Sequence, residues 1–258
     1  MFRWYKRRRR ARIREQPFPD EWESILQRNV PYYNWLPPDL QSEMRGLVQI
    51  FIDEKNIEGC GGLELTDEIR VTVAAHACTL LLRREHDCYP NVRSVLVYPD
   101  EFVVPGDVPI DENEFLDEDD ARIGESWEFG VVIVAWKPLL RAIRRPHEGM
   151  NVVLHEFAHQ LDIEDGVTDG VPFFDDDDAN KEWADVMSGA YEQLWRDIER
   201  NRDTFIDEYG ATNPAEFFAV LTETFFERPH TLQRRHPELY EVLQNYYRQD
   251  PAAVRPRV

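Results

Sequence analysis

Two segments in the first third of the chain carry apolar residues at helical spacing. Between residues 39 and 56, apolar side chains recur every three or four positions, and a Cys-Gly-Gly turn at residues 60–62 then interrupts the pattern. A second apolar face runs over residues 67–81, and Thr66 or Asp67 can cap its start. These patterns predict two amphipathic helices in the N-terminal part of the protein.

Two later segments are rich in β-branched residues and are bounded by turn residues, as strands are. They are residues 94–98 (Ser-Val-Leu-Val-Tyr) and 130–136 (Gly-Val-Val-Ile-Val-Ala-Trp), and we expect them to form a small twisted sheet. The carboxylate-rich residues 111–120 between them lack the spaced ligands of a calcium loop, so they predict an exposed loop. The four aspartates at residues 175–178 are interpreted in the same way.

The composition favours one large, acidic domain. Of the 258 residues, 42% are hydrophobic, which is enough to bury a core within the size range of a single domain. The chain has 30 Lys+Arg against 50 Asp+Glu, and its formal net charge of -20 repels phosphate backbones. Nucleic acid is therefore excluded as a main partner.

The start of the chain reverses this sign. The first fourteen residues include eight basic side chains and no acid, and we expect residues 1–14 to be a disordered tail, with contact to an anionic membrane or to the protein's own acidic body as alternatives. Acids and prolines follow where a secretory signal would need an apolar stretch, and no uncharged run approaches the roughly 20 residues of a membrane span. We expect a cytoplasmic protein without a membrane span.

The candidate chemistry lies in residues 151–162, Asn-Val-Val-Leu-His-Glu-Phe-Ala-His-Gln-Leu-Asp. His155 and His159 are four positions apart, so on a helix both imidazoles reach one cation from the same face. Glu156 is rotated by about 100° from His155 and is placed to take a proton from an attacking water. Zinc suits such nitrogen and oxygen ligands, whereas unpaired polar groups on so apolar a helix would be costly to bury. The segment therefore predicts a catalytic zinc site.

Helix spacing leaves the third protein ligand open. A longer form of the motif would continue with a glycine and a histidine, but Asp162 and Asp165 occupy those positions, so this form is excluded. The other common arrangement takes a glutamate from a second helix, and Glu216 and Glu223 lie seven positions apart on one face of such a helix. With Asn213 as N-cap, Glu216 could also serve as a capping-box residue, so both glutamates remain candidates.

Several of these stretches resemble the Mlc titration factor A family of zinc peptidases. The resemblance is carried by His-Glu-Phe-Ala-His-Gln-Leu-Asp at residues 155–162, Gly-Val-Pro at residues 170–172 and Tyr-Gly-Ala-Thr-Asn-Pro-Ala-Glu-Phe-Phe from residue 209, and it extends over nearly the whole chain beyond the basic run. The catalytic half is also similar to the peptidase domain of anthrax lethal factor. The resemblance implies a zincin-like α+β fold for residues 15–258, which the composition favours as a single domain. Within this fold we expect residues 130–136 to be the edge strand for an extended peptide.

Carried over position by position, the resemblance implies that His155, His159 and Glu216 bind Zn2+. It also implies that Glu156 is the general base and that the Tyr209 hydroxyl stabilises the developing oxyanion. The implied activity is zinc-dependent hydrolysis of peptide bonds, aminopeptidase-like on small peptides. The alternative is a regulatory binding protein that titrates a transcriptional repressor, as the namesake of the family does.

Asp162 is expected to support the site from the same helix. It follows His159 by three positions, so its carboxylate can accept a hydrogen bond from a ligand imidazole. A helix-end carboxylate without contact to the ligands is the alternative.

Overall fold

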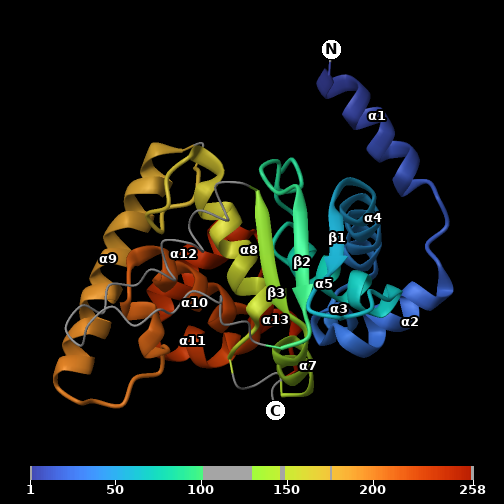
Figure 1. The fold of residues 1–258 in the computed structure, drawn as a ribbon. Helices are drawn as coiled ribbons and strands as arrows, with labels where there is room; N and C mark the ends of the chain where they lie inside the picture. Colours follow the sequence, from blue (N-terminus) through green and yellow to red (C-terminus); the bar gives the residue numbers. More distant parts are fainter. Residues whose placement is uncertain (1, 101–129, 146–148, 175, 257–258) are drawn as a thin grey trace, which may run out of the picture.

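The computed structural model describes residues 2–100, 130–145, 149–174 and 176–256. Three short strands run through the middle of the view in Figure 1, with N-terminal helices on one side and C-terminal helices on the other. The first group of helices comprises α1 (Phe2–Arg14), α2 (Asp20–Asn29), α3 (Pro31–Trp35), α4 (Pro38–Glu54) and α5 (Asp67–Thr79). The later helices are α7 (Trp136–Arg144), α8 (Val152–Asp162), α9 (Asp177–Glu199), α10 (Pro214–Glu227), α11 (Pro229–Arg235), α12 (Pro237–Tyr247) and α13 (Pro251–Val254), with 3-10 turns η1 (Ile163–Asp165) and η2 (Glu208–Ala211).

Helices α4 and α5 confirm the two helices that the apolar spacing predicted. Pro38 stands at the first helical position of α4, where its missing N–H costs no hydrogen bond. The Thr66 hydroxyl caps α5 by accepting a hydrogen bond from the Ile69 N–H at 3.3 Å. The two helices pack on each other, and both carry fully buried side chains, including Met44, Leu47, Val73 and Ala74.

The helix predicted over residues 39–56 ends earlier in the structure than its apolar pattern indicated. α4 ends at Glu54, and Asn56–Gly59 form the strand β1, which the sequence analysis did not predict. Asn, Glu and Gly are poor strand formers, so β1 has no local signal and depends on pairing with a distant strand. The Lys55 ammonium fixes the transition, since it donates to the carbonyls of Tyr89 at 2.6 Å and Val92 at 2.8 Å.

The two predicted strands are confirmed as β2 (Ser94–Tyr98) and β3 (Val131–Ala135). β1 pairs with β2 and β2 with β3, both in parallel, and alternate residues of β2 and β3 are buried on one face of the sheet. Among the described strands, β3 lies at one end of the order β1-β2-β3, where an edge strand was expected. The acidic loop predicted at residues 111–120 lies outside the described residues.

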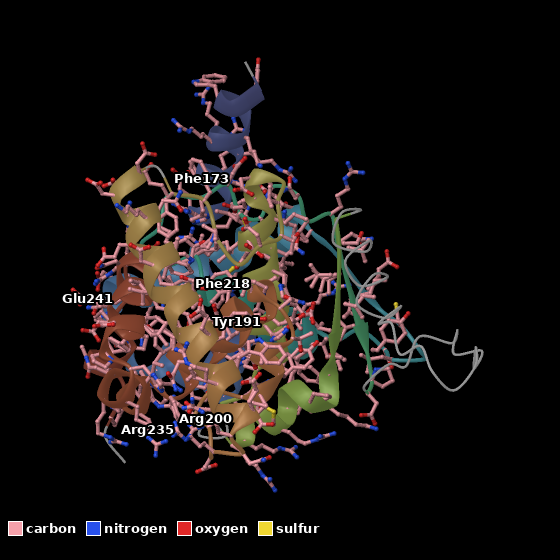
Figure 2. All side chains as sticks on the ribbon, turned by 90° about the vertical axis from the view of Figure 1, so that its left-hand side faces the viewer. Phe173, Tyr191, Arg200, Phe218, Arg235 and Glu241 are labelled. Carbon is pink, nitrogen blue, oxygen red and sulfur yellow. The ribbon has the colours of Figure 1, made fainter. Side chains whose placement is uncertain are left out.

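The helix that carries the two histidines lies between the sheet and the C-terminal helices. α8 packs against β3 and α5, and α10 packs against α8 from the other side. Phe218 of α10 is fully buried against Trp183 of α9, and the half-buried Tyr191 of α9 packs on Phe217 of α10. Arg200, Arg235 and Glu241, also labelled in Figure 2, are exposed. The helix with the two histidines is therefore fixed within the main core.

The aspartates at residues 176–178 contradict the expectation of a loop, because they begin helix α9. The Asp176 carboxylate caps the helix by accepting a hydrogen bond from the Asp178 N–H at 2.9 Å, and acids in the first turn interact favourably with the helix dipole. α9 has 23 residues but many charged side chains, and none of the helices in the described ranges is both long and apolar enough to cross a bilayer.

The basic N-terminal segment also differs from the expected disordered tail, since it forms helix α1 and packs against α4. The Arg10 guanidinium binds both carboxylate oxygens of Glu54 at 2.7 Å and one oxygen of Asp87 at 2.8 Å. Like charges along a short isolated helix repel each other, so partners distant in sequence stabilise this helix. Contact with the protein's own acidic body was one of the alternatives.

Candidate metal centre

Helix α8 presents both histidines of the motif to one point. Asn151 caps the helix by accepting a hydrogen bond from the Leu154 N–H at 3.3 Å. The apolar side chains of Val153, Phe157 and Leu161 are fully buried, which fixes the rotation of the helix. His155 and His159 therefore project together on the neighbouring face, as their spacing predicted.

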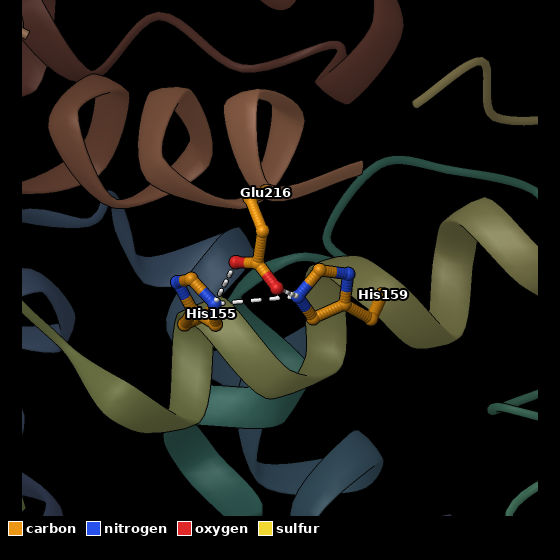
Figure 3. A group of neighbouring side chains, drawn as sticks. All are labelled: His155, His159 and Glu216. Atoms are coloured by element: carbon orange, nitrogen blue, oxygen red, sulfur yellow. Dashed lines mark hydrogen bonds and ion pairs between the residues drawn. The ribbon is translucent and has the colours of Figure 1, made fainter. Parts of the chain in front are cut away.

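A carboxylate from α10 completes the group. Figure 3 shows the two imidazoles facing each other from successive turns of α8, with Glu216 reaching in from α10. The Nε2 atoms of His155 and His159 are 3.2 Å apart, and the Glu216 oxygens lie 2.9 Å from the first and 3.5 Å from the second. Three donor atoms from two helices therefore converge on one point.

These separations fit a small divalent cation. Nitrogen and oxygen atoms that bind zinc at about 2.0–2.1 Å with tetrahedral geometry lie roughly 3.3 Å from one another. The two Nε2 atoms are 3.2 Å apart, close to that value, while Glu216 Oε2 lies 2.9 Å from His155 Nε2 and Glu216 Oε1 lies 3.5 Å from His159 Nε2. Two imidazoles and a carboxylate are also a donor set that zinc accepts, and among the described residues they form the group that could hold a metal ion.

The local structure of α10 explains why Glu216 points at the histidines. Asn213 caps the helix, its side-chain oxygen accepting from the Glu216 N–H at 2.9 Å, and Pro214 follows at the first helical position. The backbone of Glu216 therefore takes part in the cap while its carboxylate lies against the imidazoles. In a capping box the Glu216 carboxylate would instead turn back to the N–H of Asn213, so this alternative does not apply.

The charges at the centre are strongly coupled. Burial raises the pKa of the Glu216 carboxyl, but the hydrogen bonds and charges of His155 and His159 outweigh this effect and lower the pKa to about 2. Burial lowers the pKa of His155, yet Glu216 and Glu223 raise it well above its ordinary value. Burial also lowers the pKa of His159. Glu216 is consequently an anion at neutral pH.

Glu223 occupies the opposite side of the His155 ring. The His155 Nδ1–H donates to the Glu223 carboxylate at 2.8 Å, so the Nε2 atom is left to face Glu216 and His159. Glu223 also accepts a short hydrogen bond from the Asn151 N–H. Such a carboxylate fixes the tautomer and the orientation of an imidazole. Glu216 and Glu223 share a helix face, but only Glu216 lies with the converging donor atoms.

A buried polar network continues behind Glu223. The side-chain amide of Asn151 lies 3.0 Å from both Glu227 Oε1 and His76 Nδ1, and His76 Nε2 lies 3.2 Å from the Asn29 carbonyl. Burial lowers the pKa of His76 to about 4, so the ring is neutral and can accept from Asn151 at Nδ1 while donating at Nε2. Asn151 therefore links the start of α8 to α5 and α10.

Glu227 gives this network a pH dependence that can be measured. Burial raises the pKa of its carboxyl from 4.5 to about 7. The folded protein thus holds this proton more tightly than the unfolded chain, and the associated stability is complete below about pH 4.5 and lost as the pH rises through 7. We expect Glu227→Gln, which cannot ionise, to gain roughly 1–3 kcal/mol relative to the parent between pH 4.5 and 8.

The measurement is urea unfolding of the chelator-treated parent and variant over this pH range. Because the two proteins share every other titrating group, the difference in their free energies of unfolding isolates residue 227. A difference that stays constant with pH would show that the Glu227 carboxyl does not change protonation there.

The two other residues assigned to catalysis lie beside the centre. Glu156 follows His155 on α8, is partly buried, and its charge acts on the His155 imidazole. The Tyr209 ring, in η2, lies with its centroid 6.1 Å from that of His155 and is 49% exposed. Asp207 holds the start of η2 by accepting from the Tyr209 N–H at 2.9 Å. The Glu156 carboxylate and the half-exposed Tyr209 ring therefore both lie near the His155 imidazole.

The Asp162 carboxylate is hydrogen-bonded to the backbone of the segment that follows α8. Its carboxylate accepts from the Gly170 N–H at 3.0 Å, and the Gly170 carbonyl accepts from the Trp183 indole N–H at 3.1 Å. Burial raises the pKa of Asp162 to about 7. A bond from Asp162 to an imidazole, which the sequence analysis expected, stays a prediction.

Gly170 connects the two helices that carry the donor atoms. Its φ is +76°, and a Cβ at this position would lie 2.3 Å from the carbonyl oxygen of Pro214, two residues before Glu216. Gly170 is therefore hydrogen-bonded to Asp162 at the end of α8 and lies close to the backbone of Pro214 at the start of α10. The Gly-Val-Pro stretch noted in the sequence has a physical basis in this close approach.

We expect Gly170→Ala to displace the start of α10, with a loss of roughly 2–4 kcal/mol of stability and about 10- to 100-fold of affinity for Zn2+. Gly166→Ala is the matched control, since Gly166 has a φ of +94° but nothing within 4 Å of the added Cβ. It shares the backbone strain without the contact. Thermal unfolding and zinc titration of both variants test this, and equal zinc affinities would contradict the role of Gly170.

The sequence analysis did not predict the polar network of Asn151, His76 and Glu227, which forms where α5, α8 and α10 meet. The N-cap preference of Asn could have identified Asn151 before the structure was known. His76 carries no signal of its own in the sequence, because a lone histidine on a helix is usually a packed residue, and it is buried here, at 5% exposure. Its place in the network follows only from the packing of α5 against α8.

Comparison with known proteins agrees with this geometry. The family model described as glucose-regulated metallo-peptidase M90 matches residues 2–248. An uncharacterized protein of Synechocystis sp. is 41% identical over 94% of this chain and 89% of its own length. Mlc titration factor A of Klebsiella pneumoniae is 30% identical over 97% of this chain and 93% of its own, and that of Escherichia coli is 29% identical over 89% and 86%. These matches confirm the resemblance that the motifs indicated.

Proposed function

Because the chain belongs to the glucose-regulated metallo-peptidase M90 family, we propose that it is a zinc-dependent peptidase with a zincin-like fold of the gluzincin type. The observation that carries this proposal is the convergence of His155 Nε2, His159 Nε2 and the Glu216 carboxylate at 2.9–3.5 Å from one another. The substrates are peptides, and by resemblance to the family the cleavage is aminopeptidase-like on small peptides.

His155, His159 and Glu216 would hold the Zn2+ ion, which when bound acidifies water and polarises a carbonyl. Glu223 keeps the His155 ring in the orientation that this requires, because it accepts the Nδ1–H at 2.8 Å. Asn151 in turn holds the Glu223 carboxylate through its backbone N–H. In this proposal the hydrogen bonds of Glu223 hold the His155 ring in place.

Glu156 is the general base in this proposal. It takes a proton from the attacking water at its carboxylate and later delivers that proton to the nitrogen of the leaving amine. Its position next to His155 and its partial burial support this role. In this proposal a single side chain carries the proton from the attacking water to the leaving amine.

Tyr209 is proposed to donate its hydroxyl hydrogen to the oxyanion that develops on the scissile carbonyl. The ring lies beside His155, and its 49% exposure leaves it accessible to a peptide entering from solvent. β3 offers a backbone edge, among the described strands, on which an extended substrate can pair.

A second function is favoured by the name of the relatives. Mlc titration factor A is named for titrating Mlc, and we propose that this chain also binds a transcriptional regulator, either beside catalysis or with the peptidase activity gated. Binding to nucleic acid itself is not part of the proposal, given the net charge of -20.

Turnover of a peptide library, measured together with metal content, tests the peptidase proposal. We expect about one zinc per chain, loss of cleavage in the presence of a chelator, and recovery when Zn2+ is added back. Comparing free and acetylated N-termini tests the aminopeptidase assignment, which requires a free amine. A protein that takes up zinc yet cleaves no peptide would overturn catalysis and leave the regulatory function, whereas one that binds no transition metal would overturn the metal centre as well.

A further inference from the structure

Helix α1 is held to the body by one face only. Arg10 is the centre of this face: its guanidinium binds Glu54 and Asp87, and the Arg10 and Glu54 side chains are only 14% and 10% exposed. Lys6 contacts Asp87 at 3.0 Å and Arg9 contacts Asp53 at 2.7 Å. The ion pairs therefore fix both the position and the rotation of the helix.

The ion pair between Arg10 and Glu54 is maintained at neutral pH. Burial raises the pKa of the Glu54 carboxyl, but the hydrogen bond and the charge of Arg10 outweigh it and lower the pKa. Glu54 consequently remains charged at neutral pH. The buried Ile13 adds an apolar contact near the C-terminal end of the helix.

The opposite face of α1 combines exposed aromatics with exposed arginines. Trp4 and Tyr5 are 54% and 61% exposed, and their rings contact each other edge to face at a centroid distance of 5.0 Å. Arg8 lies over the Trp4 ring at 4.5 Å. We name this the outer face of α1; it consists of Trp4, Tyr5, Arg7, Arg8 and Arg12, which are all exposed.

Figures 1 and 2 show, from two directions, that the N-terminal turns of α1 extend beyond the rest of the molecule. The first turns of the helix, which carry Trp4 and Tyr5, therefore protrude from the body. Within the described part of the chain, no ion pair engages Arg7 or Arg12, although the protein carries 50 Asp+Glu.

We propose that the outer face of α1 docks the protein on the surface of an anionic lipid bilayer. Trp and Tyr have apolar rings with a polar edge and prefer the interface between headgroups and acyl chains, while each nearby arginine adds roughly a five-fold gain in affinity for an acidic leaflet. The helix lies on the membrane rather than crossing it, since its cations are distributed along its whole length.

The remainder of the protein favours a bilayer over the other polyanions. A nucleic acid duplex has to wrap or extend along a protein, and this body carries a net negative charge that repels it. Basic contacts to nucleic acid also do not require the two exposed aromatic rings. A bilayer meets only the protruding helix, and it offers both an apolar layer for the rings and acidic headgroups for the arginines.

Co-sedimentation of the full chain with vesicles tests the proposal. We expect binding to vesicles of phosphatidylcholine with phosphatidylglycerol, weakening as salt rises, and little binding to pure phosphatidylcholine. Arg8→Glu combined with Arg12→Glu, and separately Trp4→Ala combined with Tyr5→Ala, should each reduce the affinity by at least about tenfold. Thermal unfolding should be unchanged in both, because these side chains are exposed.

The matched control is Arg200→Glu combined with Arg234→Glu, an equal charge change at two exposed positions, the C-cap of α9 and the last turn of α11. This variant should bind vesicles like the parent. Equal binding to acidic and neutral vesicles, or equal loss in the control, would overturn the proposal. So would tighter binding to duplex DNA than to vesicles, which would assign the face to nucleic acid. Self-association abolished by Arg8→Glu with Arg12→Glu, without vesicle binding, would assign it to a second copy.

Discussion

Replacing Glu156 with glutamine is expected to lower the rate of peptide hydrolysis by about 10²- to 10⁴-fold while leaving zinc bound. The amide keeps the shape of the side chain but cannot accept the proton of the attacking water, and loss of general-base catalysis has this magnitude. The donor atoms of His155, His159 and Glu216 are untouched by the change. Steady-state kinetics and zinc content, measured side by side, check the result.

Tyr209→Phe is the companion variant. It removes only the hydroxyl, so it should also retain zinc, and its defect should fall mainly on kcat because the hydroxyl acts on the transition state rather than on bound substrate. If Glu156→Gln cleaves peptides as fast as the parent, Glu156 is not the base, and a contaminating peptidase or the regulatory function becomes the better explanation.

The second large effect is expected at Glu216. Glu216→Ala deletes one of three converging donors and leaves two imidazoles, so zinc affinity should fall by more than the roughly 10- to 100-fold that loss of an orienting partner costs. Glu223→Ala should show that smaller loss, because its carboxylate contacts His155 at Nδ1, away from the other donors. Zinc titration of the two variants checks the order.

Glu223→Gln serves as the control for shape and charge at the orienting position. Its side-chain oxygen can still accept the His155 Nδ1–H, so it should bind zinc more tightly than Glu223→Ala. Release of the metal by Glu223→Ala alone, with Glu216→Ala still loaded, would show that the third ligand has been misassigned and that the carry-over from the family fails at that residue.

Local signals were sufficient where periodicity and capping agree with the tertiary structure. Asn151 caps α8 and Thr66 caps α5, and the apolar residues of both helices are buried as their spacing predicts. The β-branched segments formed β2 and β3 because a half-buried strand needs alternating burial. β1 was missed, since its four residues are stabilised by pairing with β2 rather than by their own propensity.

The basic N-terminal segment shows how tertiary contacts can reverse a local expectation. Eight cations within fourteen residues indicate a solvated tail when only neighbours in sequence are considered. Asp53, Glu54 and Asp87 lie far away in sequence but neutralise one face of the helix. The repulsion between these cations can be predicted from neighbouring positions in the sequence. The acids that compensate it can be identified only from the tertiary structure.

The sequence by itself determined how the two histidines and Glu156, the proposed base, are placed relative to one another, because the spacing on one helix fixes their relation whatever surrounds them. It could not choose between Glu216 and Glu223 by spacing, since seven residues return to the same helix face. The family resemblance implied Glu216, and the tertiary structure supplies the physical reason. The packing of α10 on α8 places Glu216 at the Nε2 atoms and Glu223 at Nδ1, and an imidazole binds a cation through one nitrogen while the other holds its orientation.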